Sequence, residues 1–345
     1  MKSVSRRTVT LLAGVTAAAV TVAIVASGAT ARSTQVGSVC VLLPDTKSSV
    51  RWEQFDKPAF VNGFKKAGIK ATVVNALNDP QKQLSQAEQC ISSGAKVGII
   101  TSLDTGTSIA IQKKFTAAGG KTIDYDRQIV GGTGSVYIAF DGNLVGRIQA
   151  RGVLAGMKAK GTYGPNGVLA QLWGGPTDAN AFWFKSGNDD ILNPLFRAKK
   201  VKKGPAKFVP EWDAKNAQTI FEQFLVSTNN NIQGAVAAND NIAGAVVATL
   251  KAKGLKPIAL SGQDATVQGV QNIISGWQTN TVYKYVPAEA NAAIAAAVAL
   301  YKGKKQPTVV IPVVSITKAN YTRLFRDKFL KRSEVCSGEY KQYCR

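Results

Sequence analysis

The stretch GAVAANDNIAGAV, residues 234–246, joins a short apolar run to a helix pattern through three polar residues. Its first five residues have the length and apolarity of a strand that is buried on both faces. An Ala- and Gly-rich helix pattern follows the polar residues Asn239, Asp240 and Asn241. This order of strand, polar turn and helix is the repeating unit of α/β proteins, and it predicts a strand that lies parallel to its neighbours.

The same unit recurs along the chain. The pattern begins again after GSVYIAF (134–140), and the strands are too many for one comfortable sheet. We therefore predict an α/β fold with two lobes, each built on a parallel sheet with helices on both faces. The predicted strands are 38–43, 70–76, 96–101, 121–126, 134–140, 167–173, 207–211, 234–238, 257–262, 279–285 and 308–316. The predicted helices are 56–68, 80–94, 105–119, 143–158, 178–196, 214–228, 241–253, 266–275 and 287–302.

The first 31 residues have the composition of an export signal. Basic residues at positions 2, 6 and 7 precede an uncharged stretch, Val9 to Ala26, and Ala29 to Ala31 fits the small-x-small cleavage rule. We predict that residues 1–31 direct export to the periplasmic or extracellular cell-envelope space. The alternative is that the apolar stretch stays attached as a membrane anchor.

Four cysteines are candidates for disulfide bonds, because an exported chain meets oxidising conditions. Cys336 and Cys344 are eight residues apart in a polar tail, so a local loop closes easily. Cys40 falls in a predicted strand and Cys90 in a predicted helix, and they could pair if the helix packs on the strand. Four cysteines allow three pairings, and buried free thiols are the alternative for Cys40 and Cys90. The spacings do not resemble a zinc site.

The formal charge of +22 at pH 7 raises the question of a nucleic-acid partner. The basic residues stand in many small groups, such as Lys65–Lys66, Lys199–Lys207 and Lys302–Lys305. No basic motif interleaved with aromatic residues is present, so we expect no nucleic-acid binding. A solvated cationic surface is the expected interpretation, and nonspecific attraction to anionic envelope polymers is the alternative.

Forked and flat side chains follow the predicted strands. Because open parallel sheets bind ligands at the carboxyl ends of their strands, two facing sheets would gather these side chains in one cleft. Asp and Asn can bridge neighbouring hydroxyl groups, Arg offers a rigid fork of donors, and Trp covers an apolar C–H face. This set suits a sugar. Its members are Arg51, Trp52, Asp126, Arg127, Asp178, Asn180, Trp212, Asn239, Asp264 and Lys284, with Asp124, Asp240 and Gln263 beside them.

Most of these residues also have an explanation that involves no ligand. Surface ion pairs would explain the two arginines, and burial in the core would explain the two tryptophans. Helix N-capping would explain Asp178, Asp240, Asn241 and Asp264. The predicted site therefore depends on the joint placement of the residues at strand ends.

The sequence gives little support for catalysis. The chain contains no histidine, which excludes Ser-His-Asp and Cys-His nucleophile systems and histidine-ligated metal sites. It has no G-x-x-x-x-G-K-[ST] phosphate loop and no G-x-S-x-G elbow, and GGTGS (131–135) is interpreted as a turn between two strands. A two-carboxylate glycosidase is the remaining catalytic alternative. We expect a protein that is not an enzyme and that holds no cofactor or metal.

From about Val36 to Pro287, and more weakly to about residue 330, the chain resembles the periplasmic sugar-binding proteins of ABC importers, in particular those that bind D-xylose. The likeness is carried by RWEQFDKPAF (51–60), DYDRQI (124–129), YIAFDGNLVG (137–146), GGPTDANA (174–181), NNNIQGAVAANDNIAGAV (229–246), ALSGQDATVQGV (259–270) and QTNTVYK (278–284). It implies two Rossmann-like parallel-sheet lobes of the type I periplasmic-binding-protein fold, joined by a three-segment hinge.

The resemblance also implies domain bounds and ligand contacts. The N-terminal lobe would comprise 36–141 plus 285–312, and the C-terminal lobe 142–284 plus 313–330, followed by a basic, Cys-containing tail at 331–345. Matching positions give sugar-binding roles to the ten strand-end residues named above. Asn239 would reach the ligand, whereas Asp240 and Asn241 would serve the turn and the helix start. Ala179 departs from the family pattern, which has Asn there.

The expected function is that of a monomeric, extracytoplasmic solute-binding protein. It would capture a monosaccharide, an aldopentose such as D-xylose or a related sugar, and deliver it to an ABC permease in the membrane. One alternative is a sugar sensor of the same fold that presents its closed form to a membrane receptor. Another is a transcription regulator, which would need a DNA-binding N-terminus where the export signal stands. A third is a binder of anionic envelope polymers.

Overall fold

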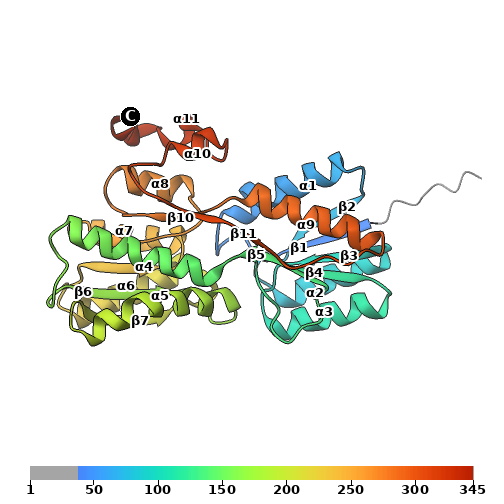
Figure 1. Ribbon diagram of the computed structural model, residues 1–345, viewed down its shortest axis with the longest axis horizontal. Helices are drawn as coiled ribbons and strands as arrows, with labels where there is room; N and C mark the ends of the chain where they lie inside the picture. The colour runs from blue at the N-terminus through green and yellow to red at the C-terminus, as the bar shows by residue number, and fades with distance from the viewer. Residues whose placement is uncertain (1–37, 345) are drawn as a thin grey trace, which may run out of the picture. The chain divides into compact units, whose positions relative to one another are not determined.

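Two parallel β-sheets organise residues 38–344, the part of the chain that the computed structural model describes (Figure 1). The first sheet has six strands in the order β11-β5-β4-β3-β1-β2, and every neighbouring pair is parallel. Strand β1 is buried from its second residue on, as its continuous apolar run predicts. The strands are β1 Ser38–Leu43, β2 Ala71–Asn75, β3 Ala95–Ile100, β4 Lys121–Tyr125, β5 Val136–Phe140 and β11 Val309–Ile311.

The second sheet has four parallel strands in the order β7-β6-β8-β9, and an antiparallel pair, β10 and β12, stands apart from it. An isolated bridge between Gln263 and Val282 ties that pair to the loop after β9. The strands are β6 Val168–Trp173, β7 Lys202–Phe208, β8 Gly234–Ala237, β9 Ala259–Leu260, β10 Thr281–Lys284 and β12 Val313–Ile316.

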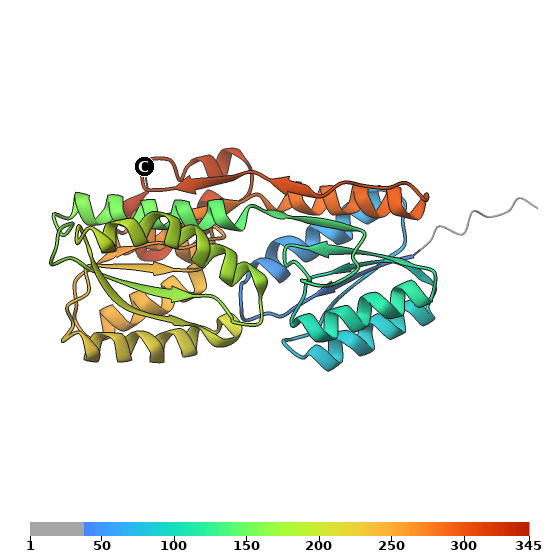
Figure 2. The same ribbon diagram turned by 60° about the horizontal axis from the view of Figure 1, so that its bottom comes forward.

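Helices cover both faces of each sheet (Figure 2). In the N-terminal lobe, α1 and α9 pack on one face and α2 and α3 on the other. In the C-terminal lobe, α4 and α5 lie together on one face, and α6 and α7 lie together on the other. The helices are α1 Lys57–Lys66, α2 Pro80–Ser92, α3 Thr105–Ala117, α4 Gly142–Ala159, α5 Ala179–Arg197, α6 Ala214–Ser227, α7 Asp240–Ala252, α8 Val267–Ile274, α9 Val286–Tyr301, α10 Arg323–Arg326 and α11 Arg332–Val335. Shorter turns are η1 Trp52–Asp56, η2 Pro210–Trp212 and η3 Gly338–Tyr343.

The chain crosses between the lobes at three places. These are the connections from β5 to α4, from β10 to α9 and from β11 to β12. The predicted fold class is therefore confirmed: the protein has two Rossmann-like lobes joined by three segments.

Two predicted strands differ from the structure. The strand expected at 207–211 is wrong, because β7 occupies Lys202–Phe208 and Pro210–Trp212 forms a helical turn. Because β7 lies at the edge of its sheet, its lysines remain in solvent. The segment therefore lacks the apolar run by which a strand is recognised in the sequence. The run 308–316 divides at Pro312, which has no N–H to donate to a sheet, into β11 and β12 in different sheets.

The four cysteines form two disulfides. Cys40 of β1 bonds to Cys90 of α2, and Cys336 bonds to Cys344. The first pair lies in the core between the first sheet and its α2–α3 layer. The predicted export signal, residues 1–31, lies outside the described residues. Within 38–344, no helix has both the length and the apolarity needed to cross a membrane.

Candidate ligand-binding site

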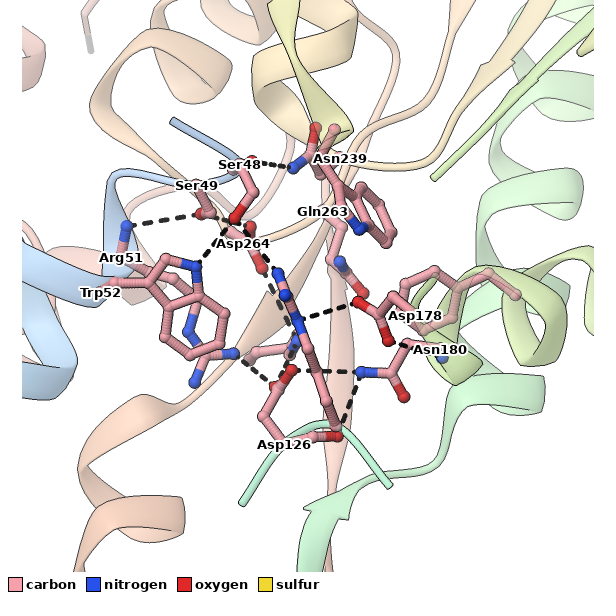
Figure 3. A pocket seen from close by; sticks show the side chains of 14 residues that line it. Ser48, Ser49, Arg51, Trp52, Asp126, Asp178, Asn180, Asn239, Gln263 and Asp264 are labelled. Atoms are coloured by element: carbon pink, nitrogen blue, oxygen red, sulfur yellow. Dashed lines mark hydrogen bonds and ion pairs between the residues drawn. The ribbon is translucent and has the colours of Figure 1, made fainter. Parts of the chain in front are cut away.

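A polar pocket of about 270 Å³ lies between the lobes (Figure 3). It is formed at the carboxyl ends of strands from both sheets, where α/β proteins place their ligands. The structure brings together all ten predicted site residues, and it adds four that the sequence reasoning left out of the set: Ser48, Ser49, Phe184 and Gln263.

On the N-terminal side of the pocket, Ser48 forms hydrogen bonds with three other residues of its own lobe. Its backbone N–H donates to Asp45 Oδ1 at 2.6 Å, and its hydroxyl donates to Asp45 Oδ2 at 2.7 Å. The same hydroxyl accepts from Trp52 Nε1 at 3.0 Å and from Arg127 Nη2 at 3.2 Å. The loop after β1 thus fixes an indole ring and a guanidinium group in the pocket wall.

Arg51 is enclosed by carboxylates. Its guanidinium binds Asp56 through Nε and Nη2, Asp126 through Nη1 at 2.7 Å, and Glu289 through Nη2 at 2.7 Å. Burial alone would lower the pKa of Arg51, but the three carboxylates raise the pKa well above its ordinary value. The surface-ion-pair explanation of Arg51 is therefore wrong, because only 1% of its side chain is exposed. The guanidinium also lies over the Trp52 ring, 4.4 Å from its centroid.

Arg127 and Lys284, the other two cations of the pocket lining, also lie against carboxylates. Arg127 Nε lies 2.9 Å from Asp178 Oδ2, and Lys284 Nζ lies 2.8 Å from Asp126 Oδ2 and 3.9 Å from Asp264 Oδ1. Burial alone would raise the pKa of Asp126, but Lys284 and Arg51 lower that pKa below its ordinary range. Burial raises the pKa of Asp178 despite its contact with Arg127. Arg127 is also buried, so the surface-ion-pair explanation fails for it too.

The two lobes touch each other directly around the pocket. Ser49 Oγ of the N-terminal lobe donates to Asp264 Oδ2 at 2.7 Å. From the C-terminal lobe, Asn239 Nδ2 donates to the Ser48 carbonyl at 2.7 Å. Asn180 Nδ2 donates to Asp126 at both its backbone oxygen, 3.0 Å, and its carboxylate Oδ1, 3.1 Å. The structure therefore presents the lobes in a closed arrangement.

Helix capping explains only part of the polar set. Asp178 does cap α5, and Asn239 caps α7 by accepting from the Ile242 N–H at 2.9 Å. The capping explanation is wrong for Asp264, because Thr266 is the N-cap of α8. It is also wrong for the two residues after Asn239. Asn241 Nδ2 donates to the Lys47 carbonyl in the opposite lobe, and Asp240 lies inside the helix.

Asp240 lies outside the pocket lining and holds one of the pocket loops in place. Its carboxylate accepts from the Thr266 backbone N–H at 2.9 Å and from Gln278 Nε2 at 2.8 Å. These bonds hold the loop that carries Asp264. Burial raises the pKa of Asp240 to about 7.

Three pocket residues adopt a left-handed backbone. The φ angles are 59° at Asp126, 57° at Trp212 and 92° at Asp264. Such conformations cost side-chain-bearing residues about 1–3 kcal/mol and cluster at functional sites. Gly174 adds a close approach, because a Cβ there would overlap the Trp212 indole.

Buried polar atoms in the lining still have hydrogen-bonding capacity. Trp212 Nε1, Gln263 Oε1 and Asp264 Oδ1 have no hydrogen-bond partner among the described residues. They offer one donor and two acceptors to a ligand. Trp52 of the N-terminal lobe and Trp212 of the C-terminal lobe add aromatic surface. Both rings also belong to the hydrophobic cores, so the core explanation holds beside the pocket position.

The pocket lining consists of paired charged groups, amides, hydroxyls and aromatic rings. In the described part of the chain, no group of three His, Cys, Asp or Glu residues is arranged to hold a metal ion. The carboxylates that line the pocket are held by cations or amides, as described above. The arrangement is suited to noncovalent recognition of a small polar ligand.

Two α/β lobes with three crossings and a polar pocket between them define the type I periplasmic-binding-protein architecture. The family model for the periplasmic binding protein domain matches residues 39–305. The chain belongs to this family. Over 300 residues it is 33% identical to the D-xylose-binding periplasmic protein of Escherichia coli (strain K12), which covers 83% of this chain and 88% of that protein.

Further relatives bind several sugars according to their names. The chain is 29% identical over 319 residues to a multiple sugar-binding periplasmic receptor of Rhizobium radiobacter, a match of 84% of this chain and 89% of that protein. A carbohydrate transporter solute-binding protein from Chloroflexus aurantiacus, solved in complex with D-glucose, has a TM-score of 0.77 and 26% identity. That match covers 86% of this chain and 97% of the other.

Weak sequence patterns could have indicated the four lining residues that the sequence analysis left out. Gln263 directly follows a predicted strand, and Ser48 and Ser49 stand in the loop before Arg51. Phe184 lies one helical turn after Asn180 on α5, so helical spacing would have placed it on the same face.

Proposed function

We propose that the protein is an exported solute-binding protein that captures one neutral monosaccharide, D-xylose, between its two lobes and delivers it to an ABC permease. In this proposal the lobes are residues 36–141 plus 285–312 and residues 142–284 plus 313–330. The protein acts as a monomer in the periplasmic or extracellular envelope space. The periplasmic relatives and the two disulfides support export.

The observation that carries the proposal is that the charged side chains of the pocket lining are already paired with one another. Three cations, Arg51, Arg127 and Lys284, lie against the carboxylates Asp126, Asp178 and Asp264. A charged ligand would compete with these buried pairs, whereas hydroxyl groups can both donate to and accept from them. The aromatic surfaces of Trp52 and Trp212 suit the C–H faces of a sugar ring.

The choice of D-xylose rests on the relatives. Two D-xylose-binding periplasmic proteins are each 33% identical to this chain. Because other relatives are named for several sugars, a panel of ligands is needed to test the choice.

Closure would couple binding to transport. Contacts such as Arg127 to Asp178 and Ser49 to Asp264 join the lobes, so a ligand enclosed by them favours the closed form. The permease would then recognise the closed surface. A sensor that shows the same surface to a receptor would share this pocket, and co-purification with a permease would separate the two functions.

A thermal-shift panel of neutral pentoses and hexoses tests the proposal. At a concentration 100 times Kd, a ligand adds about 2.7 kcal/mol of stability, which corresponds to roughly 4 °C in Tm for a chain of this length. We expect D-xylose to give the largest rise and Arg127→Ala to abolish it. Arg147→Ala, which removes an exposed ion pair with Asp190, is the matched control and should keep the rise. A flat panel with the unmodified protein would refute sugar capture.

A further inference from the structure

The C-terminal segment, residues 317–344, folds back over the C-terminal lobe beside the lobe crossings (Figure 1). Its apolar side chains share one cluster with Tyr283 of β10 and Ile274 of α8. Gln271 of α8 donates to two backbone carbonyls of α11, each at 3.3 Å. The Cys336–Cys344 disulfide closes the end of the segment. The segment therefore packs as part of the C-terminal lobe.

One aromatic side chain of this segment reaches the N-terminal lobe. Phe329 stacks on Phe55, with ring centroids 4.5 Å apart and an interplanar angle of 28°. Phe329 also packs against Tyr283, with centroids 4.9 Å apart. Lys328 has a φ of 54°, and the Phe329 N–H donates to the Leu324 carbonyl at 2.9 Å, which fixes the turn that presents the ring. Phe329 thus lies between one aromatic ring from each lobe.

Phe55 is firmly connected to the pocket wall. It lies in η1, three residues after Trp52 and next to Asp56, which holds the Arg51 guanidinium. Phe55 lines two grooves, one shared with Leu330 and the other with Lys328 and Phe329. The Phe55–Phe329 pair is therefore a contact between the lobes that lies beside open grooves.

We propose that Phe329 is a positioning residue for ligand capture, because its stacking on Phe55 forms as the lobes close and stabilises the closed form. The inference rests on the proposed function, since it concerns the affinity of the same pocket. It adds a contribution from a segment that supplies no residue to the pocket lining. The C-terminal segment would thereby set how tightly the protein holds its sugar.

The size of the effect follows from the closure equilibrium. The apparent Kd equals the intrinsic Kd divided by the fraction of protein in the binding-competent form. An aromatic pair of this kind changes an equilibrium by roughly 2- to 10-fold. Loss of the Phe329 ring should therefore raise the Kd by that factor without altering the pocket.

The test is isothermal titration of the full chain with D-xylose, or with the panel monosaccharide that the unmodified protein binds best. Phe329→Ala and Phe55→Ala should each weaken binding roughly 2- to 10-fold. The double variant should be no weaker than the weaker single variant, because both changes remove the same contact. Phe55 is only half-buried, so Phe55→Ala keeps the test open if Phe329→Ala does not fold.

Phe325→Ala is the matched control. Phe325 lies in the same segment and packs against Tyr321, also in that segment. It should lower stability but leave the Kd unchanged. Equal Kd values for Phe329→Ala, Phe325→Ala and the unmodified protein would overturn the coupling while leaving sugar capture intact. An unmodified protein that binds no monosaccharide would overturn the proposed function and the coupling with it.

Discussion

The Asn239 side chain has two separable duties, and Asn239→Asp distinguishes them. Its Oδ1 caps α7 through the Ile242 N–H at 2.9 Å, and its Nδ2 donates to the Ser48 carbonyl of the opposite lobe at 2.7 Å. Aspartate keeps the oxygen that caps the helix and is an equally good N-cap. It replaces the donor to Ser48 by a second acceptor, so the contact between the lobes is lost while the cap is kept.

The expected magnitude comes from the burial of that contact. Asn239 is 3% exposed, so in the closed form the Ser48 carbonyl would lose its side-chain donor and would face a carboxylate. An unsatisfied buried polar group costs about 1–3 kcal/mol. Sugar binding should therefore weaken roughly 5- to 150-fold. The unliganded protein can open and hydrate the new carboxylate, so its free energy of unfolding should change little.

Calorimetric titration with the sugar and urea unfolding without it measure the two duties separately. Asn239→Ala is the control, because it removes the cap as well and should also lower the free energy of unfolding by about 1 kcal/mol. Asn239→Asp with unchanged affinity would refute the role of the lobe contact. Equal losses of unfolding free energy in both variants would refute the separation of capping from binding.

Three further predictions concern charge, disulfides and ligand class. Because burial raises the pKa of Asp240 from an ordinary 3.8 to about 7, the unfolded chain releases this proton at lower pH than the folded protein. Stability should therefore fall as pH rises from about 4 to 7. A series of Tm measurements across this range should show a smaller fall for Asp240→Asn than for the unmodified protein. The same slope of Tm against pH in both proteins would contradict a buried, protonated Asp240. Removal of the Cys40–Cys90 bond, whose ends are 50 residues apart, should cost about 4 kcal/mol, and removal of Cys336–Cys344, 8 apart, about 2.5 kcal/mol in denaturant unfolding. The reverse order would contradict the loop-entropy argument. Sugar acids should bind at least 10-fold more weakly than the matching neutral sugars in competition titrations, because the buried cations of the pocket already bind carboxylates of the protein; equal affinity would contradict that pairing.

The fold was predictable because most strands and helices can be recognised from the residue pattern of their own segment. Continuous apolar runs such as Val39–Leu43 are buried as their composition requires. The edge strand β7 was missed because its lysines face solvent, and its pairing with β6 is a tertiary property. The division at Pro312 was visible as a proline, but the separate partners of β11 and β12 were not.

The pocket membership was predictable from one topological rule, since the carboxyl ends of parallel strands meet. The bonding among its members was not. Ser48 can bond to Asp45, Trp52 and Arg127 only because the fold brings these residues together. The enclosure of Arg51 by Glu289 joins residues 238 apart in sequence, which no local pattern reveals. Sugar contact by these residues stays a prediction.

A crystal structure of the protein with the best-bound monosaccharide tests the central claim most directly. The account predicts one sugar ring in the pocket, next to Trp52 and Trp212, with hydrogen bonds to Arg127 of the N-terminal lobe and Asp264 of the C-terminal lobe. A sugar bound outside this pocket, or held by residues of one lobe only, would contradict it.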